Sequence, residues 1–317
     1  MGKSSIIRWD PFTSNVDSAI DLGKMTVMTA GRALAYIQMM RPVNGLMQAF
    51  AVSIGFVVVE QSIMISSSLV LGIFTAVFTT GASMVANDYW DRDVDAINVP
   101  TRPIPSGRVT PRQAVIFTGI LSLVGLSSAF ATNFACLGIA LISLGVALAY
   151  SWKGKDTGLP GNLMVSLCVA IPFIYGGVIP KGVSTSLIEL GVIGAFAFMA
   201  FLANTGREIT KGIADMAGDQ LRDTRTIAIQ FGASVAAKVS AVFYIIPVII
   251  SLIVWVFGIL SEFYLPIVVL ADLGFFWSAL SLIHNYSETN ATRIKNRVLL
   301  SMFLGLIAFV IGGINHV

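Results

Sequence analysis

Long apolar stretches alternate with short polar connections along most of the chain. A helix that crosses a bilayer needs about 20 predominantly apolar residues, and by this criterion the pattern predicts nine spans. These cover residues 43–59, 67–87, 113–131, 134–151, 162–179, 186–205, 235–256, 263–283 and 297–315. The sequence therefore predicts an all-α membrane protein, with nine transmembrane helices in one domain that covers residues 36–317.

Composition supports the same class. The chain has 317 residues, of which 56% are hydrophobic and only 12% charged, whereas soluble domains carry about a quarter charged residues. The two cysteines, Cys136 and Cys168, lie inside apolar segments, which argues against a disulfide framework or a thiolate metal site. We expect the lipid bilayer and small molecules as partners, and no nucleic acid.

The first part of the chain differs from the rest. Residues 1–30 have no continuous apolar core that would indicate a cleavable targeting segment. Residues 1–35 mix polar and apolar positions and are interpreted as an interfacial segment, with an amphipathic helix lying on the membrane surface. A loosely ordered leader is the alternative, and no role is assigned to this segment.

Basic residues gather on one face of the predicted topology. Apart from Lys181, the Lys and Arg residues fall in the amino-terminal segment, or in and beside the connections after spans two, four, six and eight. Because positive residues are retained on the cytoplasmic side, this face is predicted to be cytoplasmic. Spans one to four and five to eight have the same organisation, since each group has a long acidic connection after its second helix.

These two acidic connections hold the candidate chemistry. Residues 87–107 read NDYWDRDVDAINVPTRPIPSG, in which Asn87, Asp91 and Asp95 recur at a spacing of four and would line one face of a helix. Asp215 and Asp219 have the same spacing after span six. Hard oxygen ligands of this kind suit Mg²⁺, which binds one or two carboxylates together with substrate phosphates. Solvated helix ends are the alternative reading.

Cations lie close to both acidic stretches. Lys and Arg bind phosphate oxygens as a point charge and as a planar fork, and each could instead serve only topology. The candidates for substrate binding are Arg102, Lys153, Lys155, Arg207 and Lys211. Aromatic faces would stabilise a carbocation, although aromatic residues at span ends are also common interfacial anchors. Those candidates are Tyr89, Trp90, Tyr150 and Trp152.

Together these features favour ionisation of an allylic diphosphate in a membrane site that faces the cytoplasm, because magnesium and basic groups stabilise the leaving group. Such a reaction needs no nucleophilic side chain, and the chain has only two histidines, His284 and His316. Asp272 lies within span eight and is a functional candidate by its position. It could also simply pair with a polar group of another span, so it is left outside the predicted site.

The first acidic stretch resembles the NDxxDxxxD and RPxxSG motifs of the UbiA superfamily of intramembrane prenyltransferases, and DMAGD resembles the second motif. The resemblance implies nine helices around a central cavity, over roughly residues 36–316. It implies Mg²⁺ and diphosphate ligands at the five acidic-stretch positions Asn87, Asp91, Asp95, Asp215 and Asp219. It adds Lys155 and Arg102 as diphosphate contacts, and an RPxN pattern at Arg41 and Asn44.

Within this superfamily, WKGKDTGLPGN and the GREI lead into the second motif are most similar to the branch that makes archaeal ether lipids. The resemblance implies transfer of a geranylgeranyl group from geranylgeranyl diphosphate to geranylgeranylglyceryl phosphate. The phosphate of this acceptor needs a second cationic subsite, for which Arg207, Lys211 and Arg41 are available. The chain departs from the branch pattern at Gly212, where an acidic residue is usual, which weakens the acceptor assignment more than the reaction class.

Three other functions are alternatives to this one. A prenyltransferase for an aromatic or tetrapyrrole acceptor, such as the chlorophyll synthase type, shares DAIN and RPIPSG. A transporter or cation channel could have acidic rings at its mouth, but transporters place polar ligands near the bilayer midplane. A phospholipid phosphotransferase would need DGxxAR followed by GxxxDxxxD, which the sequence lacks.

Overall fold

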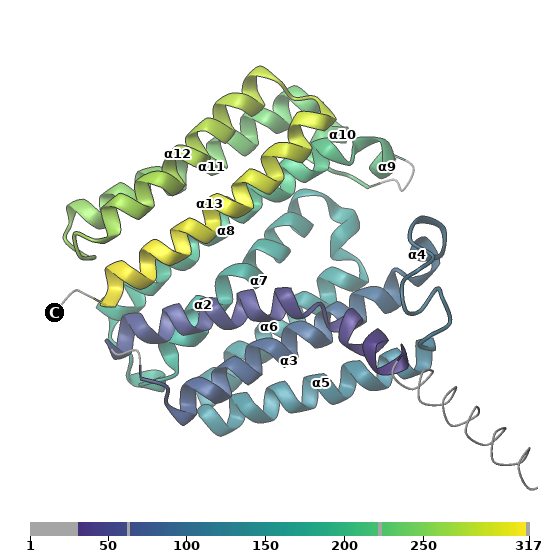
Figure 1. Cartoon of the computed structure of the whole chain (residues 1–317), viewed down its shortest axis with the longest axis horizontal. Coiled ribbons are helices and arrows are strands. Elements are labelled where there is room, and N and C mark those ends of the chain that lie inside the picture. Colours follow the sequence, from purple (N-terminus) through teal and green to yellow (C-terminus); the bar gives the residue numbers. More distant parts are fainter. Residues whose placement is uncertain (1–30, 62–63, 221–223, 315–317) are drawn as a thin grey trace, which may run out of the picture.

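The computed structural model describes residues 31–61, 64–220 and 224–314, and in these residues the secondary structure is helical, without strands (Figure 1). A short helical stretch at 31–40 precedes the first long helix. Nine helices of the described chain are long and apolar enough to cross a membrane. They are α2 (Pro42–Glu60), α3 (Ser67–Trp90), α5 (Pro111–Thr132), α6 (Phe134–Trp152), α7 (Leu159–Val178), α8 (Leu187–Ala214), α11 (Ala233–Val256), α12 (Tyr264–His284) and α13 (Glu288–Ile314). The predicted fold class is confirmed.

Two helices extend well beyond the apolar stretches that predicted them. Helix α8 continues past residue 205 to Ala214, and α13 begins at Glu288 rather than near residue 297. Hydrophobicity marks only the part of a helix inside the bilayer, whereas backbone hydrogen bonding continues through the polar residues beyond it. The start of α8 lies within one residue of the predicted start at 186, and a capping box formed by Ser186 and Glu189 fixes it there.

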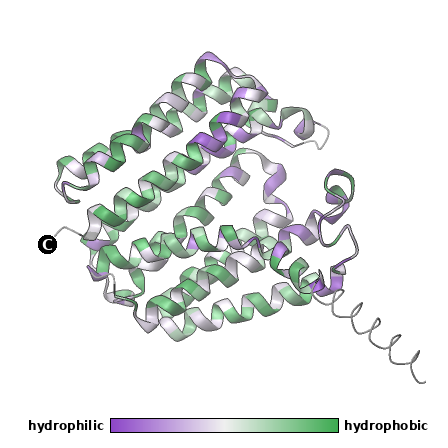
Figure 2. Cartoon of the chain, viewed as in Figure 1, coloured by the Kyte–Doolittle hydropathy of each residue, from purple (hydrophilic) through white to green (hydrophobic). Residues whose placement is uncertain are grey.

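The short helices lie in the polar connections. They are α4 (Arg92–Asn98), η1 (Gly154–Thr157), η2 (Gly182–Ser184), α9 (Met216–Gln220) and α10 (Ile227–Phe231). Figure 1 places α4 and α9 on the same side of the molecule, and Figure 2 shows extended hydrophilic segments at that end of the bundle. The two acidic connections therefore lie at one end, as the even number of spans between them predicted.

Each half of the bundle packs in the same order. Helix α2 contacts α3, α3 contacts α5 and α5 contacts α6; likewise α7 contacts α8, α8 contacts α11 and α11 contacts α12. The last helix, α13, contacts α2, α8 and α12. This order matches the predicted organisation of spans one to four and five to eight. The central cavity stays a prediction, and residues 1–30 of the predicted interfacial segment lie outside the described chain.

Glycines join the two halves where α2 crosses α7. A Cβ atom added at Gly55 would overlap the carbonyl oxygen of Phe173, and one added at Gly176 would overlap that of Val52. The two backbones are therefore in direct contact. Small residues permit such close approach of membrane helices, whose association depends on van der Waals packing because lipid tails provide no hydrophobic drive.

We expect Gly176→Ala to destabilise the protein, because the added methyl group must push α2 and α7 apart; overpacking of this kind costs about 1–3 kcal/mol. Gly145→Ala in α6 is the matched control, since a Cβ there meets no atom within 4 Å. Thermal unfolding in detergent should show a lower Tm for the first variant only. Equal melting temperatures would contradict the close crossing.

Candidate active site

In the first acidic stretch, helical hydrogen bonds continue across the junction between two helices. Helix α3 ends at Trp90 and α4 begins at Arg92, with Asp91 between them. The Asp91 amide donates to the Asn87 carbonyl at 2.9 Å, and the Asp95 amide donates to the Asp91 carbonyl at 2.8 Å. The Asn87 side-chain amide also donates to Asp91 Oδ2 at 2.9 Å. The predicted neighbourhood of Asn87 and Asp91 is therefore present in the structure.

Two predicted cations reach this stretch from different connections. Lys155, in η1, forms an ion pair with Asp91 through Nζ and Oδ1. Arg102, in the loop after α4, forms one with Asp95 at 2.5 Å. Each cation thus neutralises a different carboxylate, and the predicted stripe is divided into two ionic groups.

Sequence reasoning missed Asp88, which links these groups to α2. Its side chain is buried at the end of α3, and Oδ1 accepts from Arg41 at 2.7 Å and from Arg102 at 3.4 Å. Arg41 caps α2 with a left-handed backbone, φ 49°, a conformation that is unfavourable for a residue with a side chain. Asp88 lies one residue beyond the predicted span 67–87, and only the structure shows that α3 continues to Trp90 and buries it.

Arg41 and Asn44 also share a contact. The Arg41 guanidinium and the Asn44 amide both donate to the Met84 sulfur, each at 3.5 Å. The two positions of the RPxN pattern are therefore brought together against α3, one turn before Asp88. The structure places both of them beside the first acidic stretch.

The second acidic stretch has its own ion pairs. Asp215 ends α8, its carbonyl accepts from the Asp219 amide at 3.0 Å, and its carboxylate lies 3.7 Å from Lys295 of α13. Glu208, one further residue that sequence reasoning missed, forms ion pairs with Arg207 at 3.0 Å and Lys211 at 3.6 Å. The Asp215 pair could not be inferred from spacing, because Lys295 is distant in sequence. Glu208 and Lys211 are three residues apart, but the predicted span ended at residue 205, so their shared helix was not predicted.

The Arg207 guanidinium has a remaining donor. Its Nε atom is buried and has no hydrogen-bond partner within the described chain. A buried donor without a partner is unfavourable by about 1–3 kcal/mol, which an anionic ligand would relieve.

The connection around η1 links the two halves of the site. Its Lys155 binds the first acidic stretch, while the Asp156 carbonyl accepts from the Arg225 amide, after α9, at 3.4 Å. Gly158 has φ 73°, and a Cβ there would overlap the Arg225 carbonyl oxygen. Tyr150 lies within electrostatic range of Asp91, Asp156 and Glu208. Both acidic stretches therefore lie around one short connection.

Two of the residues considered from the sequence, Lys153 and Asp272, do not join these ion pairs. Lys153 is exposed, and its ammonium group lies 4.9 Å from the centre of the Trp152 ring, so the structure does not bring it to a carboxylate. Asp272 accepts from Ser251 Oγ of α11 at 2.7 Å. The alternative considered for Asp272, pairing with another span, is thus confirmed.

The donor atoms fit Mg²⁺, but they do not form a complete coordination shell. Among the described residues, no three His, Cys, Asp or Glu side chains are grouped closely enough to hold a metal ion. Magnesium requires no such group where substrate phosphates and waters supply most of its ligands. The carboxylates of Asp91 and Asp95 are each paired with a flexible cation, which a bound metal would have to displace.

These features define a multi-pass helical membrane protein with acidic and basic side chains gathered at one end of the bundle. The sequence profile of the UbiA prenyltransferase family matches residues 48–310. The chain belongs to this family, which confirms the resemblance seen in its motifs.

Comparison with individual proteins gives the same result. Digeranylgeranylglyceryl phosphate synthase of Methanosphaera stadtmanae is 30% identical over 88% of this chain and 99% of its own length. A solved structure from work on digeranylgeranylglyceryl phosphate synthase in membranes has a TM-score of 0.78 and 25% identity, and the match covers 90% of this chain and 99% of that one. A UbiA homologue from Archaeoglobus fulgidus, bound to GPP and Mg²⁺, has a TM-score of 0.63 and 20% identity over 87% of this chain and 99% of its own.

We expect Asp88→Asn and Arg41→Gln each to lower stability, and the double variant to lose less than the sum. The reason is that Asp88→Asn leaves Arg41 without its carboxylate partner, while Arg41→Gln leaves the buried Asp88 only the longer contact with Arg102. Contacting residues give coupling energies of about 0.5–3 kcal/mol. A double-mutant cycle of thermal unfolding in detergent measures this coupling. Arg112→Gln is the control, since Arg112 is exposed on α5 and forms no ion pair within the described residues. Strict additivity would contradict the pairing.

Proposed function

We propose that this protein transfers a geranylgeranyl group from geranylgeranyl diphosphate to geranylgeranylglyceryl phosphate, giving digeranylgeranylglyceryl phosphate and diphosphate. The observation that carries the proposal is similarity to curated digeranylgeranylglyceryl phosphate synthases over nearly their whole length. Seven further curated relatives with this name are 29–34% identical to the chain. This similarity favours the lipid acceptor over an aromatic or tetrapyrrole one.

The acidic residues are proposed as the magnesium and diphosphate site. Support comes from their oxygen chemistry and from the homologue of the same fold that binds GPP and Mg²⁺. The ligands proposed are Asn87, Asp91, Asp95, Asp215 and Asp219. Magnesium, when bound, would neutralise phosphate charge and so make diphosphate a better leaving group.

The nearby cations are proposed to bind the same diphosphate. Lys155 and Arg102 already contact Asp91 and Asp95, so they need only exchange a carboxylate for a phosphate oxygen. Because Lys155 comes from η1 and Arg102 from the loop after α4, two separate connections would contribute cations to the same diphosphate. Lys153 would join them only if it left the Trp152 ring.

The reaction then follows from charge. The allylic C–O bond breaks and its electron pair leaves with the diphosphate. The acceptor hydroxyl then forms a new C–O bond to the prenyl carbon and gives its proton to the released diphosphate. Lys155 and Arg102 stabilise the departing charge most strongly as it develops. Tyr150, near Asp91 and Glu208, offers its ring face to the cationic carbon.

The phosphate of the acceptor is proposed to bind a separate group of cations. Arg207 and Lys211 share Glu208, and the buried Nε of Arg207 is a donor without a partner in the described chain. Arg41, held with Asn44 beside α3, is the third candidate. A phosphate oxygen beside Arg207 would accept a hydrogen bond from its unpartnered Nε, while Glu208 keeps Arg207 and Lys211 in position.

We also propose that the protein lies in the cell membrane with this site toward the cytoplasm. The support is the distribution of basic residues, which follows the positive-inside rule. On the opposite face lies Lys181, which is paired with Glu189, and a single lysine there does not offset the many basic residues at the acidic end.

We expect purified protein to form digeranylgeranylglyceryl phosphate only when magnesium, geranylgeranyl diphosphate and geranylgeranylglyceryl phosphate are all present. Asp91→Asn and Asp219→Asn should each lower kcat by about 10²–10³, as loss of one charge-stabilising group does in other enzymes. Diphosphate release and product formation measure this. Asp93→Asn is the matched control, because its side chain is 84% exposed next to the site.

Assays with a lipid acceptor and with an aromatic acceptor distinguish the proposed substrate from the proposed reaction. Turnover with an aromatic acceptor and none with geranylgeranylglyceryl phosphate would remove the lipid substrate but retain prenyl transfer. Full activity of both acidic variants would remove the proposed ligands. No turnover with either acceptor would contradict the function itself.

We expect cysteines placed at opposite ends to react from opposite sides of the membrane. Ile97 in α4 is 84% exposed and Val183 in η2 is 93% exposed, so either cysteine should be reachable. In a Cys168→Ser background, an impermeant maleimide should label Val183→Cys in intact cells and Ile97→Cys only in inverted vesicles. The reverse result would place the acidic end outside.

A further inference from the structure

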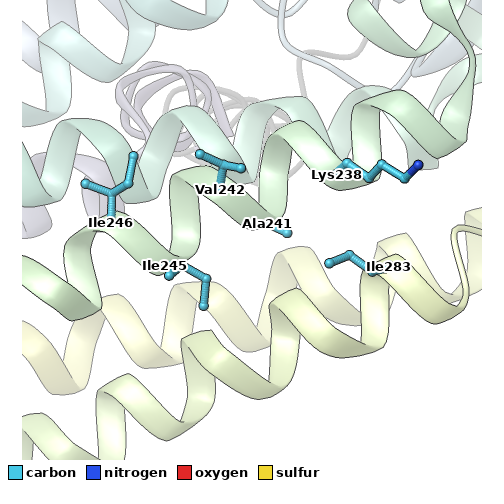
Figure 3. Close-up of a pocket in the computed structure, with 6 residues that line it drawn as sticks. All are labelled: Lys238, Ala241, Val242, Ile245, Ile246 and Ile283. Carbon is cyan, nitrogen blue, oxygen red and sulfur yellow. The ribbon is translucent and has the colours of Figure 1, made fainter.

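The outer face of the bundle has an apolar groove between α11 and α12 (Figure 3). Its volume is about 370 Å³, and it is lined by Lys238, Ala241, Val242, Ile245 and Ile246 of α11 and by Ile283 of α12. The α11 positions follow a spacing of three and four, so they form one continuous stripe along that helix. None of the proposed active-site residues contributes to the groove.

The groove exists because a small residue lies between large ones. Ala241 is buried and forms the floor, while Val242 is 57% exposed and Ile283 is 42% exposed at the sides. Except for the ammonium group of Lys238, the lining presents only carbon to the groove. Apolar hollows of this kind stay dry and accept apolar ligands, and both helices are membrane spans.

Charge defines one end of the groove. Lys238 lies near the start of α11, close to the polar end of the bundle, and the stripe runs from it for about 12 Å toward the bilayer centre, at 1.5 Å per residue. Several basic residues at this end have a carboxylate partner, namely Arg41, Arg102, Lys155, Arg207, Lys211 and Lys295. Lys238 forms no ion pair within residues 31–61, 64–220 and 224–314, so its charge is available to a ligand.

We propose that this groove binds an anionic phospholipid of the surrounding bilayer. One hydrocarbon chain lies along Ala241, Val242 and Ile245, and the headgroup phosphate accepts from the Lys238 ammonium group. The order of cation and apolar stripe matches the order of headgroup and chain in a lipid. A lysine stem that follows the apolar surface while its charge stays at the interface is well suited to this contact.

The test compares two lipids with identical chains. Detergent-purified protein is stripped of lipid and titrated with dioleoyl phosphatidylglycerol or dioleoyl phosphatidylcholine, and bound lipid is counted by native mass spectrometry. Wild type should prefer the anionic lipid. Lys238→Gln should weaken phosphatidylglycerol binding about fivefold, the contribution of one lysine near an anionic headgroup, and weaken phosphatidylcholine binding less, because the choline cation offsets the charge of its phosphate. Val242→Trp, which fills the groove from its exposed side, should weaken both.

Arg297→Gln is the matched control, because it removes a cation from the neighbouring span α13 outside the groove. Excess inorganic phosphate should not displace the lipid, since a free anion leaves the apolar stripe empty. Equal binding of the two lipids by wild type, unchanged preference in Lys238→Gln, an equal effect of Arg297→Gln, or displacement by phosphate alone would each overturn the proposal.

Discussion

Neutralisation of carboxylates at the end of an apolar bundle is the constraint on which the site depends. An unpaired charge at such a boundary is strongly unfavourable, whereas a pair with good geometry is tolerated. Asp88 is buried and shared by Arg41 and Arg102, and these arginines come from the start of α2 and the loop after α4. Pairing therefore draws separate connections onto α3, and it leaves cations beside acids where a phosphate can replace either partner.

The difference between apolar spans and the paired charges at their ends explains what the sequence could predict. Spans were predictable because length and apolarity suffice, and α2 and α6 agree with their apolar stretches within a residue or two. Motif resemblance singled out Lys155 as a diphosphate contact, but neither its ion pair with Asp91 nor the different placement of Lys153 was predicted. These lysines are two residues apart, and only the turn into η1 decides which one meets a carboxylate.

Partners supplied by distant segments were beyond sequence reasoning. Lys295 pairs with Asp215 across 80 positions of the chain, because α13 packs against α8. Glu208 lies where α8 outlasts its apolar stretch, and nothing in the local pattern distinguishes it from a solvated helix end. Asp88 follows directly after the predicted span 67–87, so the sequence placed it at the span's end but did not show that it is buried. Its significance depends on Arg41, which only the packing of α2 on α3 brings near.

The direct contact of backbones at Gly55 and Gly176 has a mechanical consequence. No side chain separates α2 from α7 at this crossing, so the two helices cannot slide past each other there without collision. Any relative movement of the two helices would therefore be a rotation about the crossing. Arg41 lies 14 residues before Gly55 along α2, about 21 Å away at 1.5 Å per residue. A rotation of about 5° at this crossing would move the Arg41 end by about 2 Å and would widen the polar end while the crossing stays closed.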